Sequence, residues 1–215
     1  MESPNTQSFD NNYENNDFYF GSVASEELEE FCDKGVVAQN ALALDLGCGE
    51  GRDSLMLARK GYSLVSIDKS QEGVNKLIQA AFAEGLNIDA RCQDVESYNF
   101  PIEKYDLIVS VTLLDHLTKD RIGKIIEMMK MALKRNGVIF IEVFTVDDPG
   151  FQDVNRRNAS ECASFIMHYF EHGELIAYFK DYKIIRYEEK LEVDESHGPT
   201  HEHGVAILLA RKEID

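Results

Sequence analysis

Short apolar runs alternate with longer amphipathic segments between residues 41 and 145. The runs are rich in aliphatic side chains and predict strands at Ala41–Leu46, Ser63–Ile67, Ile88–Cys92, Tyr105–Val111 and Val138–Phe144. The longer segments carry apolar positions at helical spacing and predict helices at Asp53–Lys60, Gln71–Glu84 and Arg121–Lys134. This alternation predicts an α/β fold with a doubly wound, mostly parallel sheet.

The last third of the chain follows a different pattern. Gly173–Phe179 is predicted as a short helix, and Tyr182–Glu188 and Val205–Ala210 as two strands joined by a polar turn. Two such late strands indicate an antiparallel hairpin at the edge of the sheet. Residues 1–24 are rich in polar side chains and are predicted to form a flexible N-terminal arm, which leaves residues 25–215 as a single domain.

The charge balance restricts the partners that we expect. The 215 residues include 22 Lys and Arg against 39 Asp and Glu, and the net charge is −17. A surface this acidic repels the phosphate backbone of nucleic acids and anionic membrane surfaces. The sequence therefore predicts a small-molecule substrate, with no nucleic acid and no membrane as a partner, and it contains no signal for an oligomeric state.

The four cysteines, at positions 32, 48, 92 and 162, have neither metal-binding nor redox spacing, so no disulfide framework is expected. The N-terminal residues lack the pattern of a signal peptide. The longest apolar runs fall short of the ~20 residues that a membrane helix needs. These features favour a cytoplasmic protein.

The most informative segment is Leu44-Asp-Leu-Gly-Cys-Gly-Glu-Gly-Arg-Asp53, in which an apolar strand enters a glycine-rich turn and then a helix. Such a turn at the carboxyl end of a parallel strand is where open α/β sheets bind ligands. Arg52 stands where the dinucleotide motif needs a small residue, and the segment lacks the Lys-Ser or Lys-Thr of a phosphate loop. A ligand without a pyrophosphate is favoured, and a nicotinamide oxidoreductase is a distant alternative.

Three carboxylates follow the first three predicted strands. Asp68 is placed to accept hydrogen bonds from ribose hydroxyls, Asp94 from an adenine amine, and Asp45 to pair with an ammonium group. This set suits a ligand that carries an amino group, a sulfonium, a ribose and an adenine.

The glycine turn, with Asp68 and Asp94 at their spacings, resembles the class I S-adenosylmethionine-dependent methyltransferases over roughly residues 41–145. The resemblance implies S-adenosyl-L-methionine as the cofactor and a Rossmann-like fold. The positions that it assigns to the cofactor, with their neighbours and an aromatic residue from the N-terminal arm, are Asp45, Gly47, Cys48, Gly49, Arg52, Asp68, Lys69, Asp94, Val95, Val111 and Tyr19.

A second resemblance covers the last quarter of the chain. The segments similar to the tail of the tellurite-resistance methyltransferases are Phe165–Phe170, Gly173-Glu-Leu175, Tyr178-Phe179, Tyr187-Glu-Glu189 and Leu209-Ala-Arg-Lys212. It implies methyl transfer to a small chalcogen, metalloid or thiol compound. Ile176 and Ala177 stand where that family usually has an Arg suited to an oxyanion, which weakens the case for an oxyanion substrate.

Two histidine features leave alternatives open. His116, after the fourth strand, is the candidate catalytic residue, as a general base or by orienting the acceptor, although a purely structural role explains it equally well. His197, His201 and His203 suit a transition metal or metalloid, but a polar loop in water is the simpler interpretation and no metal site is assigned. The alternative functions are a non-catalytic cofactor-binding module and a metal- or metalloid-binding protein that uses these histidines.

Overall fold

The computed structural model describes residues 6–14, 18–152, 166–195 and 199–213. Its seven-stranded sheet has the order β3-β2-β1-β4-β5-β7-β6, in which β1 to β5 are parallel and β7 runs antiparallel to both of its neighbours. The strands are β1 (Leu42–Leu46), β2 (Ser63–Asp68), β3 (Ile88–Cys92), β4 (Tyr105–Val111), β5 (Leu133–Phe144), β6 (Lys183–Asp194) and β7 (His201–Arg211). The predicted parallel sheet with a C-terminal antiparallel hairpin is confirmed.

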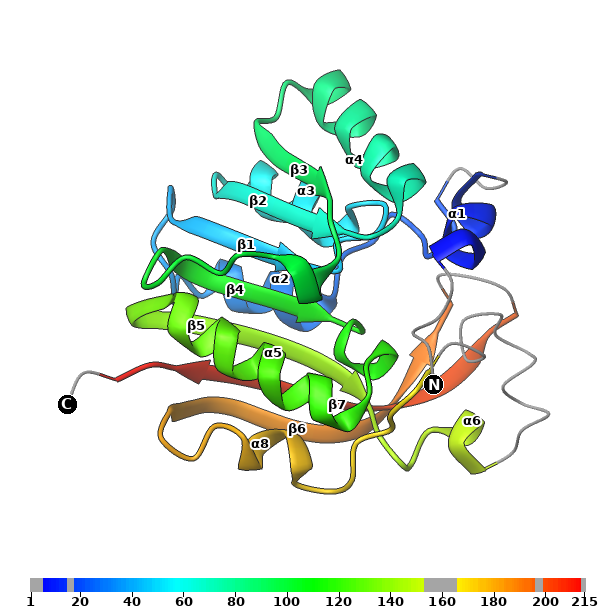
Figure 1. The fold of residues 1–215 in the computed structure, drawn as a ribbon, viewed down its shortest axis with the longest axis vertical. Helices are drawn as coiled ribbons and strands as arrows, with labels where there is room; N and C mark the ends of the chain where they lie inside the picture. The colour runs from blue at the N-terminus through cyan, green and yellow to red at the C-terminus, as the bar shows by residue number, and fades with distance from the viewer. Residues whose placement is uncertain (1–5, 15–17, 153–165, 196–198, 214–215) are drawn as a thin grey trace.

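Helices cover both faces of the sheet (Figure 1). On one face, α2 (Glu26–Asp33) and α3 (Arg52–Arg59) bury their apolar sides against alternate strand residues such as Ala43 and Val109. On the other face, α5 (Lys119–Ala132) and the short α8 (Glu174–Ala177) pack over Leu44 and Ile108. Because both sides of the central strands are buried, those strands are apolar at successive positions.

The remaining elements lie at the margins of these layers. The helix α4 (Gln71–Glu84) packs beside β2 and β3, and it begins and ends where the sequence predicts. Ser70 Oγ accepts a hydrogen bond from Gly73 N at its start, and Gly85 ends it in the left-handed conformation. The short elements are η1 (Val95–Ser97), η2 (Leu114–His116) and α6 (Pro149–Gln152). In the part of the chain that the structure describes, no helix is long and apolar enough to cross a membrane.

The N-terminal region differs from the predicted arm. Residues Thr6–Glu14 form a helix, α1, that packs against α4. Phe9 and Tyr13, one turn apart, are 8% and 4% exposed, and Asp10 accepts a hydrogen bond from the hydroxyl of Ser70. The segment is polar on average, which predicted an arm, but Phe9 and Tyr13 lie on one face of the helix at positions i and i+4. Packing of these two rings against the rest of the protein stabilises the helix.

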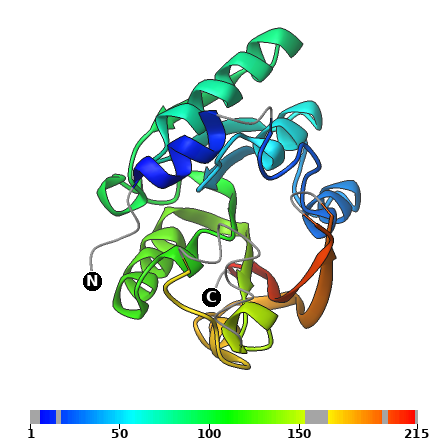
Figure 2. The ribbon, with the colours of Figure 1, turned by 90° about the vertical axis from the view of Figure 1, so that its right-hand side faces the viewer.

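The elements converge at the carboxyl ends of the parallel strands. The strand order reverses between β1 and β4, and such a switch point opens a crevice between the loops that follow the two strands. Seen from that end of the sheet, α1 lies across one side and the free ends of β6 and β7 lie on another (Figure 2).

Candidate active site at the carboxyl ends of the strands

The glycine turn between β1 and α3 depends on residues that lack a side chain. Gly47 and Gly51 have φ of 75° and 95°, a conformation that other residues rarely adopt. A Cβ atom on Gly51 would lie 2.3 Å from Cδ1 of Leu77, and one on Gly47 would lie 2.9 Å from Cβ of Leu113. The turn therefore brings its backbone close to both α4 and the loop after β4.

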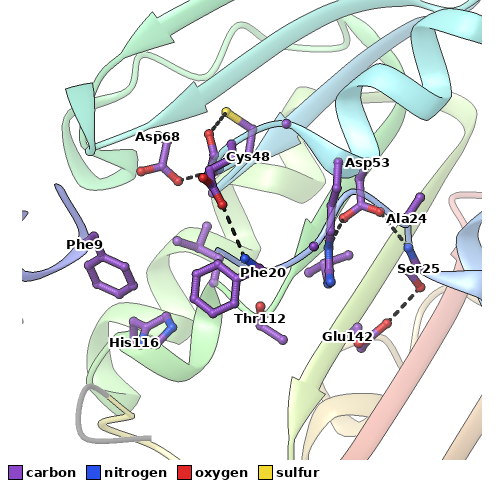
Figure 3. A pocket seen from close by; sticks show the side chains of 18 of the residues that line it. Phe9, Phe20, Ala24, Ser25, Cys48, Asp53, Asp68, Thr112, His116 and Glu142 are labelled. Carbon is purple, nitrogen blue, oxygen red and sulfur yellow. Dashed lines mark hydrogen bonds and ion pairs between the residues drawn. The ribbon is translucent and has the colours of Figure 1, made fainter. Parts of the chain in front are cut away.

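A cavity of about 780 Å³ lies beside this turn, within the range typical of small-molecule sites. Nearly all the predicted cofactor residues line it, together with the predicted catalytic residue: Gly47, Cys48, Gly49, Arg52, Asp68, Lys69, Asp94, Val95, Val111 and His116. Figure 3 shows Asp68, Phe9 and His116 toward one side and Asp53, Ser25 and Glu142 toward the other. Following the expectation from the sequence, we call these the cofactor end and the acceptor end.

Asp68 is held in place by the backbone around it. Its carboxylate accepts hydrogen bonds from Gly49 N at 2.9 Å and from Ser70 N at 2.8 Å, one on each oxygen. Burial raises the pKa of Asp68, and these two amide hydrogen bonds oppose the rise. Each oxygen keeps a further acceptor position, so the carboxylate remains suited to a pair of ligand hydroxyls.

Asp94 lies on the exposed side of the same end. One of its carboxylate oxygens accepts a hydrogen bond from Glu96 N at 2.8 Å and so caps η1, while the residue also lines the cavity. Val95, which follows it, is buried and gives this corner an apolar wall.

Asp45 does not lie where the sequence predicts. It is 2% exposed beneath α3, where its carboxylate accepts a hydrogen bond from Ser54 Oγ at 2.6 Å. Burial, reinforced by the nearby Asp53 carboxylate, raises the pKa of Asp45 to about 7. Ala43 and Asp45 of β1 face this helix, so Asp45 supports the turn, and its contact with an ammonium group stays a prediction.

Aromatic side chains from the N-terminal region cover the cavity. Phe9 lies 5.3 Å from the ring of His116 in an edge-to-face arrangement, and Lys69 Nζ lies 5.2 Å from the centre of the Phe9 ring. Tyr13 and Phe20 also line the cavity. Tyr19, which the sequence assigned to the cofactor, is not part of the cavity wall; its neighbour Phe20 is, and the Tyr19 backbone amide donates to Glu50.

The segment of residues 19–25 is fastened to the site along its length. Glu50, 5% exposed, accepts from the Tyr19 amide at 2.7 Å and pairs with Lys76 at 2.7 Å. Ser25 donates its amide to Asp53 at 2.9 Å and its hydroxyl to Glu142 at 3.0 Å. Sequence reasoning missed this segment because its partners lie 28 to 117 positions away.

The acceptor end is rich in charged groups that the sequence did not group together. Arg52, Glu142, Glu192, Asp194 and His203 all line it. Glu142, in β5, is 8% exposed, and burial raises its pKa to about 7 although the nearby Arg52 opposes the rise. The three carboxylates outnumber the single guanidinium, so this end of the cavity is acidic.

The end of β4 and the loop after it contribute some residues to the cavity wall. Val111 and Thr112 line the cavity, and Thr112 adopts a φ of 49°, whereas Ser110 is fully buried. His116 belongs to the cofactor end, where it contacts Phe9. Its catalytic role stays a prediction, and His203 is a second histidine on the cavity wall, at the acceptor end.

The family-like segment near the C-terminus is mainly structural. Phe170, Leu175 and Phe179 are fully buried in the main core, and Ile176 packs against the same core. Position 176 therefore lies away from the cavity wall, and the charge of the acceptor end comes from β5, β6 and β7. Phe165, Cys162 and His197 lie outside the described residues.

Solved structures with the same architecture define the class of protein. A methyltransferase structure from Methanosarcina mazei, described as S-adenosylmethionine-dependent, superposes with a TM-score of 0.69, covering 86% of this chain and 98% of that one at 20% identity. The crystal structure of TehB from Haemophilus influenzae superposes with a TM-score of 0.71, covering 88% of this chain and 63% of that one at 28% identity. The fold is the Rossmann-like fold of class I methyltransferases.

Sequence comparison then identifies the family. The family model described as "Tellurite resistance protein TehB" matches residues 9–210, so the chain belongs to the TehB family of S-adenosylmethionine-dependent methyltransferases. The "probable S-adenosyl-L-methionine-dependent methyltransferase TehB" of Haemophilus influenzae (strain KW20 / Rd) is 30% identical over 174 residues, which are 79% of this chain. The match covers 57% of the length of that relative.

Proposed function

We propose that the chain binds S-adenosyl-L-methionine at the cofactor end of the cavity and transfers its methyl group to a small molecule at the acceptor end. The observation that carries the proposal is the half-buried Asp68 carboxylate, which Gly49 N and Ser70 N orient beside the glycine turn. Membership of a methyltransferase family supports the same conclusion.

The residues present fit this cofactor. The turn from Gly47 to Gly51 offers backbone without side chains, so that a ligand can approach closely. Asp68 suits the two hydroxyls of a ribose, and Asp94 and Val95 offer a carboxylate and an apolar wall to an adenine. Phe9 and Phe20 close the space above with apolar surface.

The chain contributes alignment and exclusion of water to the reaction. The bound cofactor supplies an electrophilic methyl group on a sulfonium. Phe9, Tyr13 and Phe20 keep water away from the cavity, and residues 19–25 link the cover to β5 through the Ser25–Glu142 hydrogen bond. Holding donor and acceptor in one dry cavity lowers the barrier mainly through proximity and orientation.

The proposed acceptor belongs to the chalcogen, metalloid or thiol compounds, and the tellurite resistance in the name of the family supports the chalcogens. A cavity of about 780 Å³ that also contains the cofactor leaves room for a small acceptor. The net charge of −17 argues against nucleic acid as a substrate. We keep the cytoplasm as the expected location, because the cysteines are few and scattered.

The experiment is transfer of labelled methyl groups from S-adenosyl-L-methionine to a panel containing tellurite, selenite, small thiols and small phenols. Wild-type chain is expected to methylate at least one chalcogen or thiol compound. Asp68→Ala is expected to raise the KM for the cofactor at least 10-fold, with most of the kcat recovered at saturating cofactor.

Two results would contradict the proposal. Cofactor binding without turnover on any acceptor would favour a non-catalytic binding module. An unchanged KM in Asp68→Ala would remove the role assigned to this carboxylate. Asp89→Ala is the matched control, since Asp89 lies on the neighbouring strand β3 and pairs with the exposed Arg91.

A further inference from the structure

Three potential metal ligands meet where the free ends of β6 and β7 reach the cavity. Asp194, His201 and His203 each offer one ligand atom, and these atoms lie within 4.8 Å of one another. The antiparallel register places Asp194 opposite His201 and Glu192 opposite His203. Asp194 and His203 also line the acceptor end of the cavity.

His203 is oriented as a metal-binding histidine is. Its Nδ1 lies 2.8 Å from Oδ2 of Asp148, a residue that is 3% exposed, and its Nε2 lies 3.9 Å from Oδ2 of Asp194. A carboxylate that accepts from Nδ1 fixes the tautomer, directs the Nε2 lone pair away and raises its basicity. Metal-binding histidines almost always have such a partner.

The Asp148 carboxylate is itself fixed by the backbone. It accepts hydrogen bonds from Gly150 N at 2.7 Å and Gly204 N at 3.2 Å. Gly204 follows His203, and a Cβ atom on it would lie 2.3 Å from Asp148 N. Only a glycine at position 204 therefore lets the backbone at Asp148 come this close. The close packing of the β6–β7 hairpin against Asp148 thus keeps the Asp148 carboxylate next to His203.

His201 is held in a comparable way. Its Nδ1 lies 2.8 Å from the carbonyl oxygen of Pro199, which places the proton on Nδ1 and the lone pair on Nε2. The rings of His201 and His203 lie 4.6 Å apart in an edge-to-face arrangement, and the His203 ring also packs against Phe144 at 4.7 Å. Both imidazoles are thus ordered before any ligand arrives.

We infer that Asp194, His201 and His203 form a binding site for a divalent transition metal of the zinc class, open toward the acceptor end of the cavity. Two imidazole nitrogens and one carboxylate oxygen are a ligand set for zinc and its neighbours, whereas magnesium and calcium prefer oxygen ligands. Three protein ligands leave a coordination position for a molecule in the cavity, as in catalytic zinc sites. The set differs from the three histidines that the sequence suggested, since Asp194 is part of it.

Such an ion explains how an acidic cavity accepts a soft nucleophile. Glu142, Glu192 and Asp194 surround a space in which Arg52 already faces Asp53 at 3.6 Å. A thiolate or a reduced chalcogen is repelled by these carboxylates but is a good ligand for a zinc-class ion. This role for the metal as the anchor of the acceptor rests on the proposed function, whereas the site itself does not.

The test uses the chain without an affinity tag. Zn²⁺ is titrated calorimetrically and Co²⁺ is followed by its visible absorption, in wild type and in His203→Ala, His201→Ala and Asp194→Asn. Wild type is expected to bind one ion, and each variant to bind it at least 10-fold more weakly. His172→Ala, which changes an exposed histidine outside the site, is the matched control and is expected to leave the affinity unchanged within twofold.

A second variant addresses the supporting carboxylate. Asp148→Ala retains all three ligands and is expected to weaken binding by 10- to 100-fold, the usual effect of losing such a partner. Circular dichroism melting identifies any variant that fails to fold. Absence of saturable Zn²⁺ binding to wild type, or equal affinity in wild type and the folded His203→Ala variant, overturns the inference.

Binding of S-adenosyl-L-homocysteine, measured in the same samples, separates the two proposals. The metal-site variants are expected to bind this cofactor product as wild type does. If wild type binds Zn²⁺ but not the cofactor product, the proposed function fails and the metal site stands. If it binds the cofactor product but not Zn²⁺, only the metal site fails.

Discussion

The two ends of the cavity are built in different ways. The polar groups of the cofactor end come from consecutive strand ends: the glycine turn follows β1, Asp68 is the last residue of β2, and Asp94 follows β3. The acceptor end gathers side chains from residues 20–26, β5, β6 and β7, such as Ser25, Glu142, Asp194 and His203. The polar groups of the cofactor end lie in short segments that can be recognised in the sequence. Those of the acceptor end come from distant segments that meet only in the folded chain.

The difference also extends to the chemical groups involved. At the cofactor end, backbone amides and glycines position the half-buried Asp68 carboxylate. At the acceptor end, charged side chains face one another with few backbone contacts, and Glu142 has its pKa raised to about 7 by burial. We therefore expect substitutions at the cofactor end to act through backbone geometry, and those at the acceptor end to act through charge.

The largest effect is expected from Gly51→Ala. The new Cβ atom would meet Leu77 at 2.3 Å at a φ of 95°, so overpacking and left-handed strain together should cost about 4 kcal/mol of unfolding free energy. Denaturant unfolding measures this cost. Gly61→Ala is the matched control, because Gly61 has a φ of 91° with nothing within 4 Å, and strain alone should cost about 1 kcal/mol. Equal losses in the two variants would contradict the close packing of the turn.

Glu142, at the acceptor end, is expected to make the free energy of unfolding depend on pH. Between about pH 4.5 and 7 the unfolded chain releases the Glu142 proton while the folded chain keeps it, so stability falls as pH rises through this window. Glu142→Gln should remove this part of the fall, by up to about 3 kcal/mol. Urea unfolding at pH 5 and pH 8 checks it.

The interpretation of that experiment depends on the groups around Glu142. Arg52 favours the charged carboxylate, as does the Ser25 hydroxyl, whereas Glu192 and Asp53 oppose it. Asp45, whose pKa is also raised to about 7 by burial, contributes in the same direction and remains in the variant. Parallel pH profiles for wild type and variant would show that Glu142 is ionised throughout.

A smaller effect is expected from the aromatic cover. Phe9→Ala removes a ring that lies over the cofactor end between Lys69 and His116, and it should weaken binding of the cofactor product about 10-fold. Phe82→Ala, which changes a side chain that is 86% exposed on α4, should have no effect on binding. Calorimetry compares the two variants, and similar affinities would remove α1 from the binding site.

The sequence-based prediction is accurate where the structure depends on local side chains, and it fails where distant segments meet. The period of apolar residues predicted the five parallel strands and α4 with its ends, because each depends on local side chains and on caps such as Ser70 and Gly85. The boundary between α5 and β5 was misplaced. Leu133 pairs with Tyr105 in the sheet, a contact that no local pattern indicates.

The candidate site was predicted where local geometry determines it. Asp68 ends β2 and Asp94 lies two residues after β3, and both line the cavity. Asp45 is not part of the cavity wall, because one residue along a strand reverses the face to which a side chain points, and its contact with the cofactor stays a prediction. The acidic acceptor end was not predicted, since Glu142 and Asp194 meet only through the strand order β5-β7-β6.

The most direct test of the central claim is calorimetric titration of S-adenosyl-L-homocysteine into wild type, Asp68→Ala and Asp89→Ala. We predict one binding site in wild type, an affinity reduced at least 10-fold in Asp68→Ala, and an unchanged affinity in Asp89→Ala, whose carboxylate pairs with Arg91 away from the cavity. The same affinity in all three proteins, or no binding to wild type, would contradict the assignment of the cofactor end.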